Sequence, residues 1–196
     1  MAYRGDPVRV LVVPGLHDSG PTHWQTWLEG HFRRSTRVVQ QDWTRADLER
    51  WAGTVEMAIA REPGVRWVAV AHSFGCLALA RYLALGGAGV HAALLVAPAD
   101  PEKFAAGPSL PQAPLPIPSA ILASENDPWM RLESARGWSR IWRSQFINLG
   151  AVGHINVEAG FGPLPQAKTL VELMIQRVER QRRPERAHPL EFSFAL

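Results

Sequence analysis

The sequence predicts an α/β fold in which helices cover both faces of a parallel sheet. Short runs rich in Val, Ile and Leu alternate with longer segments of helical periodicity, an alternation typical of parallel sheets. Proline and glycine end several of the helical segments. A chain of 196 residues is long enough for one domain with a sizeable core and too short for a second of similar size.

Six apolar runs are the predicted strands. In doubly wound sheets the first and third strands are commonly neighbours, so we expect the order 2-1-3-4-5-6. The six runs are residues 8–13, 36–41, 66–71, 91–97, 119–124 and 144–150.

Three segments between or after these runs are predicted helices. The first begins near Thr44 and Asp47, which have almost the spacing of a capping box, and it stops at Pro63 and Gly64. The second, residues 73–87, is apolar nearly all round, which predicts a buried helix that ends at its glycines. The third runs from Pro165 to about Arg182. Its apolar positions fall on one face: Leu170, Leu173, Met174 and Val178.

Residues 98–118 do not follow the alternation, because they contain seven prolines, which exclude a long regular helix. We expect an ordered surface loop. It leaves the C-terminal end of the fourth strand, where sheets of this class bind their ligands. The sequence leaves two roles open: the loop forms a wall of the substrate site, or it only connects two strands.

The charge of the chain gives no sign of a nucleic-acid partner. The net charge is +3, and residues 177–186 hold five Arg against two Glu, which accounts for the whole excess. We interpret this segment as the solvated end of the last helix. A single domain is expected over residues 1–180, followed by a C-terminal tail at 181–196.

The apolar runs and the cysteine content argue against a membrane protein, a secreted protein and a disulfide-bonded protein. No apolar stretch reaches the roughly 18 residues that a membrane span needs, and the N-terminus has no secretory pattern, so a cytoplasmic protein without a membrane partner is expected. Cys76, the one cysteine, can form no internal disulfide, and its apolar neighbours favour a buried thiol. No metal-binding cluster appears, and no cofactor is expected.

The sequence Ala71-His72-Ser73-Phe74-Gly75 stands between a predicted strand and a predicted helix. A sharp turn at this joint exposes one side chain above the sheet if small residues flank it, as in a nucleophile elbow of the G-x-S-x-G type. Here alanine replaces the first glycine. A helix N-cap serine is the alternative interpretation, although an N-cap needs no flanking glycine.

A serine nucleophile needs a base and a carboxylate, and in this fold class they follow it in the order acid, then histidine. Asp127 follows the fifth predicted strand and His154 follows the sixth. Glu125 is the second choice of acid and Asp100 the third.

The other histidines are weaker candidates for the base. His17 and His23 precede the serine, which is the wrong order, and His72 adjoins it and is expected to point away at the turn. Surface positions are expected for the rest, which are His31, His91 and His188.

The loop after the first strand should meet the serine, because neighbouring parallel strands end at the same edge. Gly15 allows a close backbone approach, so the amides of Leu16 and Phe74 are the expected oxyanion donors. The aromatic side chains near this edge could also simply pack in the core. The expected substrate pocket is shallow and consists of Gly15, His17, Trp24, His72, Phe104, Trp129 and Asn156. A hydrogen bond of Asn156 is expected to steady the loop of the base.

Five blocks in this order resemble one known family. They are "VVPGLHDSGPTHWQTWLE", "VAHSFGCLALA", "LLVAPADPEKF", "SENDPW" and "LGAVGHINVEAGFG". From about Val8 to about Val178 the chain resembles the small bacterial serine hydrolases related to retinoblastoma-binding protein nine, in the α/β-hydrolase superfamily. The resemblance implies a compact hydrolase without a lid, with Ser73, Asp127 and His154 as its triad. Members are similar to carboxylesterases, are usually assayed on short acyl esters, and have mostly undefined natural substrates.

We therefore expect a serine hydrolase that cleaves a small carboxylic ester through an acyl-enzyme, with an amide as the second choice of substrate. Two alternatives stay open at this point. One is a non-catalytic protein-interaction module on a hydrolase scaffold, with an unknown partner, because a fold does not fix a function. The other is an acyltransferase that passes the acyl group to an acceptor other than water.

Overall fold

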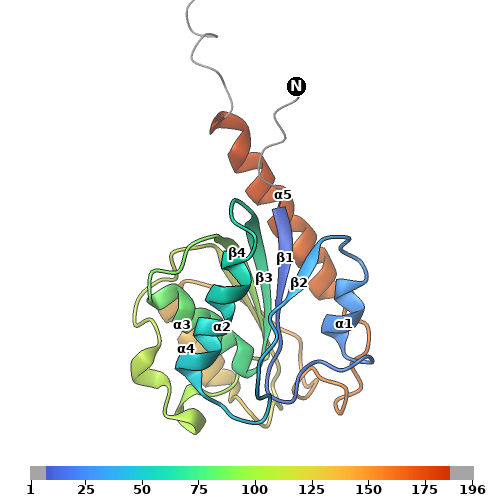
Figure 1. The fold of residues 1–196 in the computed structure, drawn as a ribbon. Coiled ribbons are helices and arrows are strands. Elements are labelled where there is room, and N and C mark those ends of the chain that lie inside the picture. Colours follow the sequence, from blue (N-terminus) through green and yellow to red (C-terminus); the bar gives the residue numbers. More distant parts are fainter. Residues whose placement is uncertain (1–7, 186–196) are drawn as a thin grey trace, which may run out of the picture.

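The structure is a computed structural model that describes residues 8–185. Its centre is a six-stranded sheet with the order β2-β1-β3-β4-β5-β6, and every neighbouring pair is parallel (Figure 1). This confirms the predicted fold class and strand order. The strands are β1 (Val8–Val13), β2 (Ser35–Arg37), β3 (Arg66–His72), β4 (Val90–Val96), β5 (Ser119–Ala123) and β6 (Gln145–Asn148).

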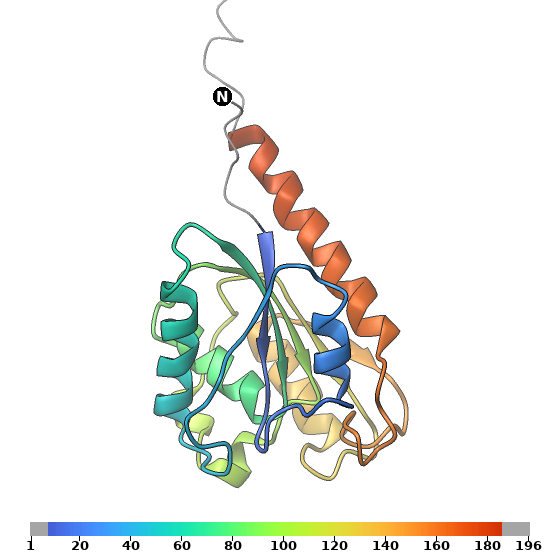
Figure 2. The same cartoon turned by 45° about the vertical axis from the view of Figure 1, so that its right-hand side comes forward.

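Helices cover both faces of this sheet, as predicted. Figures 1 and 2 show α2, α3 and α4 on one face and α1 and α5 on the other. The helices are α1 (Trp24–Glu29), α2 (Leu48–Ala60), α3 (Phe74–Ala84), α4 (Leu132–Trp142) and α5 (Pro165–Glu185).

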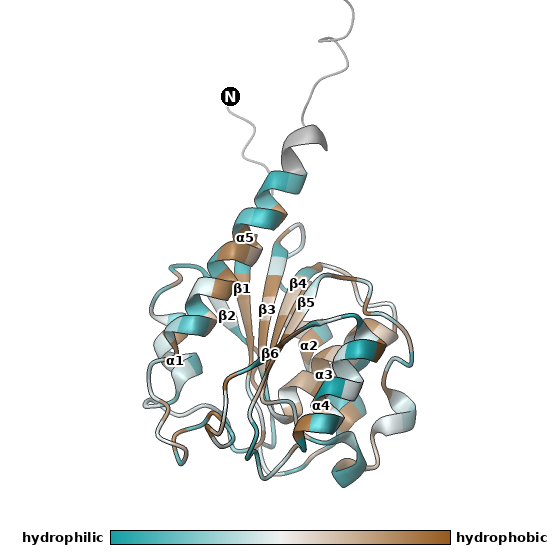
Figure 3. Ribbon diagram, turned by 180° about the vertical axis from the view of Figure 1, so that it is seen from behind, coloured by the Kyte–Doolittle hydropathy of each residue, from teal (hydrophilic) through white to brown (hydrophobic). Residues whose placement is uncertain are grey.

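Alternation along the strands supplies a core on each face. In β1, Leu11 and Val13 face α2 and α3, while Val10 and Val12 face the layer of α1 and α5. All four are at most 1% exposed. In Figure 3 the apolar strands lie between helices whose outer faces are polar. The sheet is therefore buried on both sides, which is why its strands are almost continuously hydrophobic.

Several boundaries differ from the sequence prediction: for example, β6 covers 145–148 instead of 144–150, and α3 ends at Ala84 before the glycines. β2 covers only residues 35–37, which pair with β1, instead of the predicted 36–41. Beyond this pairing the Val38 amide still donates to the Val12 carbonyl at 2.8 Å. The N-cap of α2 is Asp47, whose side chain accepts from the Arg50 amide, and not Thr44. α5 continues to residue 185, past the expected end at 182, so the first residues of the expected tail are helical.

Two helices, α1 and α4, were not expected from the sequence. α1 has only six residues and lies in what reads as a loop between two strands. α4 follows the fifth strand, and its buried side chains are few: Ala135, Ser139 and Trp142. Helices of six and eleven residues form because they pack on a sheet rather than through their own propensity.

The proline-rich segment, residues 98–118, contains no long helix, as its prolines predicted. Two 3₁₀ turns, Pro101–Phe104 and Gly107–Ser109, stand in place of a helix. The rest of the segment packs on α4, where the Trp142 indole donates to the Pro111 carbonyl at 2.9 Å.

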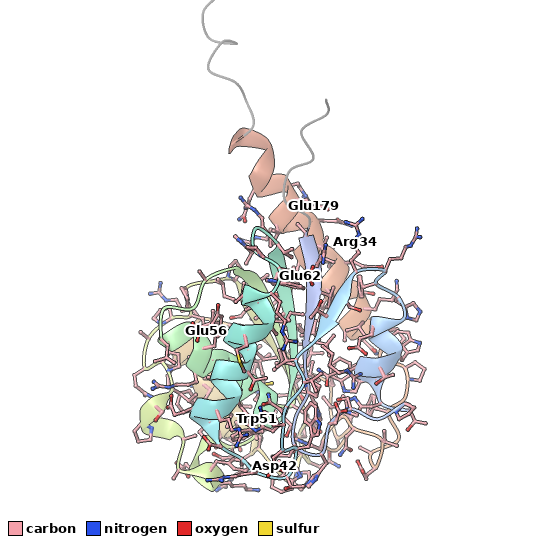
Figure 4. The ribbon with its side chains drawn as sticks, viewed as in Figure 1. Arg34, Asp42, Trp51, Glu56, Glu62 and Glu179 are labelled. Carbon is pink, nitrogen blue, oxygen red and sulfur yellow. The ribbon has the colours of Figure 1, made fainter. Side chains whose placement is uncertain are left out.

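Parallel strands bring all their C-terminal ends to one edge. Figure 4 shows Asp42 at this edge and Glu62 toward the opposite one. α5 runs back along the sheet and extends beyond the edge opposite the strand C-termini (Figure 2). Arg177 and Arg180 near its end are exposed, as expected of a solvated helix end, and residues 186–196 lie outside the described part.

Candidate active site

Ser73 stands at the joint between β3 and α3 in a backbone conformation that few L residues adopt. Its φ is 52° and its ψ is −125°. A Cβ added to Gly75 would lie 2.3 Å from the Pro14 carbonyl oxygen, so only glycine allows α3 to approach the end of β1 this closely. Ala71 is completely buried, and its methyl group fits at the position where the elbow pattern has glycine. The serine makes no side-chain cap bond to the helix, which is evidence against the N-cap interpretation.

The side chains of Ser73, His154 and Asp127 form a continuous chain of hydrogen bonds. Nε2 of His154 lies 2.9 Å from Oγ of Ser73. Nδ1 of the same ring lies 2.9 Å from each carboxylate oxygen of Asp127. The Asp127 side chain is only 2% exposed, and Oδ1 also accepts from the Trp129 amide at 2.8 Å. The structure thus brings together the three residues that the sequence analysis selected.

The two alternative acids have other partners. Glu125 is exposed and accepts a hydrogen bond from the Asn148 side chain at 2.8 Å. Asp100 caps the 3₁₀ turn after β4 by accepting from the Glu102 amide at 3.1 Å. Among these three carboxylates, only that of Asp127 hydrogen-bonds the His154 ring.

A polar link that the sequence analysis missed holds the loops of Asp127 and His154 together. Oδ1 of Asn126 accepts from the Gly153 amide at 2.7 Å and from the Ser124 hydroxyl at 3.0 Å. That hydroxyl in turn accepts from the Val152 amide at 3.0 Å. The two backbone donors, Val152 and Gly153, directly precede His154, so this link fixes the backbone that positions the His154 ring. The signal in the sequence that could have indicated this role is the position of Asn126 directly before Asp127.

Asn156 steadies the other side of the same loop, as expected. Its Oδ1 accepts from the Ala159 amide at 3.1 Å, and its backbone carbonyl accepts from the Phe161 amide at 2.9 Å.

The loop after β1 approaches the serine closely. A Cβ added to Gly15 would lie 2.7 Å from the Cβ of Ser73, so the position requires glycine. Within the described part of the chain, neither the Leu16 amide nor the Phe74 amide donates to a protein acceptor outside regular secondary structure. Both residues adjoin the nucleophile region, Phe74 along the chain and Leu16 in the cleft lining. The segments that carry the two expected donors therefore lie beside the nucleophile, and their role as an oxyanion hole stays a prediction.

Two side chains that were not expected from the sequence fix this loop: Gln25, which is buried, and Arg37, which is partly buried. The Gln25 amide nitrogen donates to the Val13 carbonyl at 3.3 Å and to the Val70 carbonyl at 3.0 Å, which ties the ends of β1 and β3 together. Arg37 donates to the Ser19 carbonyl at 2.7 Å and pairs with Asp18 at 3.0 Å. An anchored loop of this kind keeps its backbone amides in one geometry.

A cleft of about 810 Å³ opens beside Ser73 and His154. Of the expected pocket residues, those that line it are His17, His72, Phe104, Trp129 and Asn156. Gly15 is not among the lining residues and lies against the Cβ of Ser73. Trp24 does not line the cleft: it is fully buried in the core under α1 and α5, because it starts a helix that the sequence analysis missed. Further lining residues, not expected, are Asp18, Gly20, Thr22, His23, Pro128, Gly153, Val157, Glu158 and Ala159.

This arrangement agrees with the comparison with known proteins. A model of the family described as Serine hydrolase matches residues 10–173. The chain belongs to the serine hydrolase family. The match confirms the resemblance drawn from the sequence motifs, and it makes the protein a hydrolase of the α/β-hydrolase superfamily. No curated protein matches the chain.

Solved structures resemble this serine hydrolase over most of its length. A YdeN-like hydrolase from Pectobacterium atrosepticum has 34% sequence identity and a TM-score of 0.82, and the match covers 86% of this chain and 91% of that one. The ydeN gene product of B. subtilis has 18% identity and a TM-score of 0.71, covering 87% and 99%. The esterase RhEst1 from Rhodococcus sp. has 17% identity and a TM-score of 0.62, covering 88% and 90%. The last two show the shared fold.

His72 of this serine hydrolase does not point away from the site, contrary to the sequence prediction. Its Nε2 donates to the backbone carbonyl of His154 at 3.0 Å, and its ring lies 4.9 Å from the His154 ring. Complete burial lowers the pKa of His72 well below the usual value of 6.5, so the ring is neutral. A strand-end side chain was expected to turn outward, but the loop of His154 folds over it.

The remaining histidines and the cysteine have structural surroundings. His31 is exposed and packs against Trp27, with ring centroids 4.3 Å apart. His91 is half-buried rather than on the surface, and His188 lies outside the described residues. Cys76 is buried, as expected, and burial raises the pKa of its thiol far above the usual value.

Neither a metal cluster nor a membrane span is found where the structure can be described. Residues 8–185 contain no group of three or more His, Cys, Asp or Glu side chains that could hold a metal ion. Over the same residues, no helix combines the length and the apolar character needed to cross a bilayer.

Proposed function

We propose that this serine hydrolase cleaves carboxylic esters of small acyl groups through a covalent acyl-enzyme on Ser73. The observation that carries the proposal is the hydrogen-bond chain from Ser73 Oγ through His154 to Asp127, with both links at 2.9 Å. A serine hydroxyl is a weak nucleophile until a base accepts its proton, and a carboxylate on the far nitrogen sets the tautomer that allows this.

In the first half-reaction, Ser73 Oγ forms a bond to the ester carbonyl carbon while its proton passes to His154 Nε2. The carbonyl electron pair moves onto oxygen, and the amides of Leu16 and Phe74 donate to this oxyanion. The intermediate then collapses: the carbonyl bond re-forms, the bond to the alcohol oxygen breaks, and His154 returns the proton to the departing alkoxide. The products are a free alcohol and an acyl group on Ser73.

In the second half-reaction, water gives a proton to His154 and its oxygen attacks the acyl carbon. The tetrahedral intermediate releases the carboxylic acid and Ser73 Oγ takes the proton back. Asp127 stays ionised throughout and stabilises the imidazolium that forms twice in each cycle. No step requires a cofactor.

The cleft suggests a small substrate. Phe104 and Trp129 supply an apolar wall, with ring centroids 6.4 Å apart, and Trp129 is 44% exposed at the rim. The proline-rich loop contributes to this wall through Phe104, which supports the first of its two roles. An open apolar wall can cover a short acyl chain along its whole length, whereas the end of a long chain would reach water.

Two measurements test the proposal. The first is labelling of the native protein with a fluorophosphonate, followed by peptide mass spectrometry, with Ser73→Ala as the control. The expected result is one adduct on Ser73. The second is hydrolysis of p-nitrophenyl esters from acetate to decanoate, where we expect kcat/KM to be highest for the short chains and to fall about 10⁴-fold or more in Ser73→Ala.

Different outcomes separate the alternatives. The absence of an adduct on Ser73 would favour a non-catalytic interaction protein. An adduct together with ester synthesis in the presence of added alcohols, at the expense of hydrolysis, would favour an acyltransferase. Labelling with hydrolysis that is unaffected by Ser73→Ala would place the chemistry elsewhere and contradict the proposal.

A further inference from the structure

His23 lies in the wall of the cleft and is fixed by the start of α1. It is the N-cap of that helix, and its Nδ1 accepts the Gln25 amide at 3.1 Å. The side chain is only 5% exposed, yet it belongs to the cleft lining. The ring is therefore held in one orientation by a backbone donor.

That contact also determines where the proton of the ring is. A nitrogen that accepts a hydrogen bond carries no hydrogen, so the neutral ring has its proton on Nε2. Burial lowers the pKa of His23 to about 4, with a further contribution from the positive charge of Arg37. At neutral pH this imidazole is consequently an uncharged donor.

Within residues 8–185 this donor has no protein partner. Among the described residues, no hydrogen bond of His23 Nε2 to a protein acceptor is found, and the Nδ1 side is occupied by the helix. Polar groups in such confined surroundings are almost always satisfied by protein, water or ligand. Nε2 is thus the polar atom of this ring that a ligand in the cleft can reach.

The position of the ring relates it to the reacting centre. The His23 and His72 ring centroids are 5.0 Å apart, and those of His72 and His154 are 4.9 Å apart. The Trp129 ring also lies near His154, with ring centroids 6.2 Å apart. The cleft lining therefore has an apolar part, where Trp129 and Phe104 lie next to the base, and a part that we call its polar end, where His23 is separated from the base by one further ring, that of His72.

We propose that His23 determines specificity: its Nε2–H donates to an oxygen in the part of the ester that extends away from the scissile carbonyl at the polar end of the cleft. The preferred substrate then has an apolar group on one side of the ester and an ether, hydroxyl or carbonyl oxygen on the other. This inference rests on the proposed esterase activity.

We expect this preference because a substrate without an oxygen at this position leaves the His23 donor without a hydrogen bond. A plain alkyl chain over His23 displaces water from a donor that it cannot satisfy, whereas an oxygen at the same place restores the hydrogen bond. The discrimination expected from one neutral hydrogen bond is about 10-fold in kcat/KM.

Isosteric ester pairs test this directly. On the acyl side, p-nitrophenyl methoxyacetate is compared with p-nitrophenyl butyrate; on the alcohol side, 2-methoxyethyl acetate is compared with n-butyl acetate. Each pair is measured in the wild type, in His23→Asn and in His31→Asn. Asparagine is a good N-cap, so it keeps the bond to the α1 backbone, but its shorter side chain withdraws the donor. His31 is exposed, and its variant is the matched control.

The measured quantity is the ratio of kcat/KM for the oxygen-containing ester to that for the alkyl ester. Differences in intrinsic reactivity cancel when this ratio is compared between wild type and variant. We expect His23→Asn to lower the ratio about 10-fold for one of the two pairs, which identifies the side of the ester that faces His23. We expect His31→Asn to leave both ratios unchanged.

A loss of structure would lower both rates together and leave the ratio unchanged, so the ratio reports the contact itself. Unchanged ratios for both pairs in a His23→Asn protein that still hydrolyses esters would overturn this inference and leave the proposed function intact. A wild-type protein that hydrolyses none of the four esters and is not labelled on Ser73 would instead refute the proposed function.

Discussion

His72 donates its Nε2–H to the backbone carbonyl of His154 across 82 positions of the chain, at 3.0 Å. The bond joins His72, the residue before the nucleophile, to the backbone of His154, the base. It therefore holds the loop of His154 against the turn of Ser73. It also requires a proton on Nε2 of His72. Two of the histidines that line the cleft, His23 and His72, are neutral rings with depressed pKa values.

Stability should therefore fall as the pH decreases. Both histidines have a folded-state pKa below 6.5, so below that pH the unfolded chain binds more protons than the folded one. Each histidine should remove about 1.4 kcal/mol of unfolding free energy per pH unit, and the loss from His23 should level off below about 4. Urea denaturation from pH 7 to pH 4 measures this. His23→Asn should show a shallower dependence than wild type, and an equally steep one would contradict the assignment.

Asp127 and Glu125 should differ sharply when they are changed to their amides. Asp127→Asn loses the charge that stabilises the His154 imidazolium, and kcat for p-nitrophenyl acetate should fall about 10³- to 10⁴-fold. Glu125→Gln is the matched control, two residues away and exposed, and should stay within about threefold of wild type. The reverse order would mean that the acid is Glu125.

Asn126 should act on the rate through the position of His154. Asn126→Ala removes the acceptor of the Gly153 amide, and a small displacement of the base should lower kcat about 10- to 100-fold with little change in KM. Asn126→Asp retains an oxygen at this place and should recover most of the rate. Equal losses in the two variants would show that the oxygen is not what matters.

Two glycines should respond to alanine in opposite directions. A Cβ at Gly75 would meet the backbone of Val13 and Pro14, so Gly75→Ala should lower the unfolding free energy by about 3 kcal/mol or more. Gly137 lies within α4 with nothing within 4 Å of an added Cβ, and Gly137→Ala should raise it by about 0.5–1 kcal/mol. Urea denaturation of both variants provides the comparison. A stable Gly75→Ala protein would mean that the elbow and the β1 loop are further apart.

Cys76 should be inert in the native protein. Its thiol is buried and its pKa is raised, so iodoacetamide should neither modify it nor inhibit ester hydrolysis until the chain unfolds. Labelling with and without urea, followed by mass spectrometry, tests this. Rapid native labelling together with loss of activity would indicate a cysteine nucleophile.

The sequence by itself determined the sheet, its strand order, the serine and the histidine of the hydrogen-bond chain, and Asp127 as the first of three candidate acids. Burial on both faces forces near-continuous apolar runs in the strands, and these are visible without coordinates. The elbow could be recognised because its turn needs small residues around Ser73. The order of acid and base along the chain then pointed to Asp127 and His154, because each follows a strand.

Only the tertiary structure decided which side chains meet around that chain. Trp24 looked like a loop aromatic, yet the short helix α1 buries it and turns its neighbour His23 into the cleft. His72 was expected to face outward, and the loop of His154 folds over it. Whether Glu125, Asp100 or Asp127 reaches the base depends on loop conformations that local sequence does not encode, because contacts between residues far apart in the chain, such as Asn126 with Gly153, fix those loops.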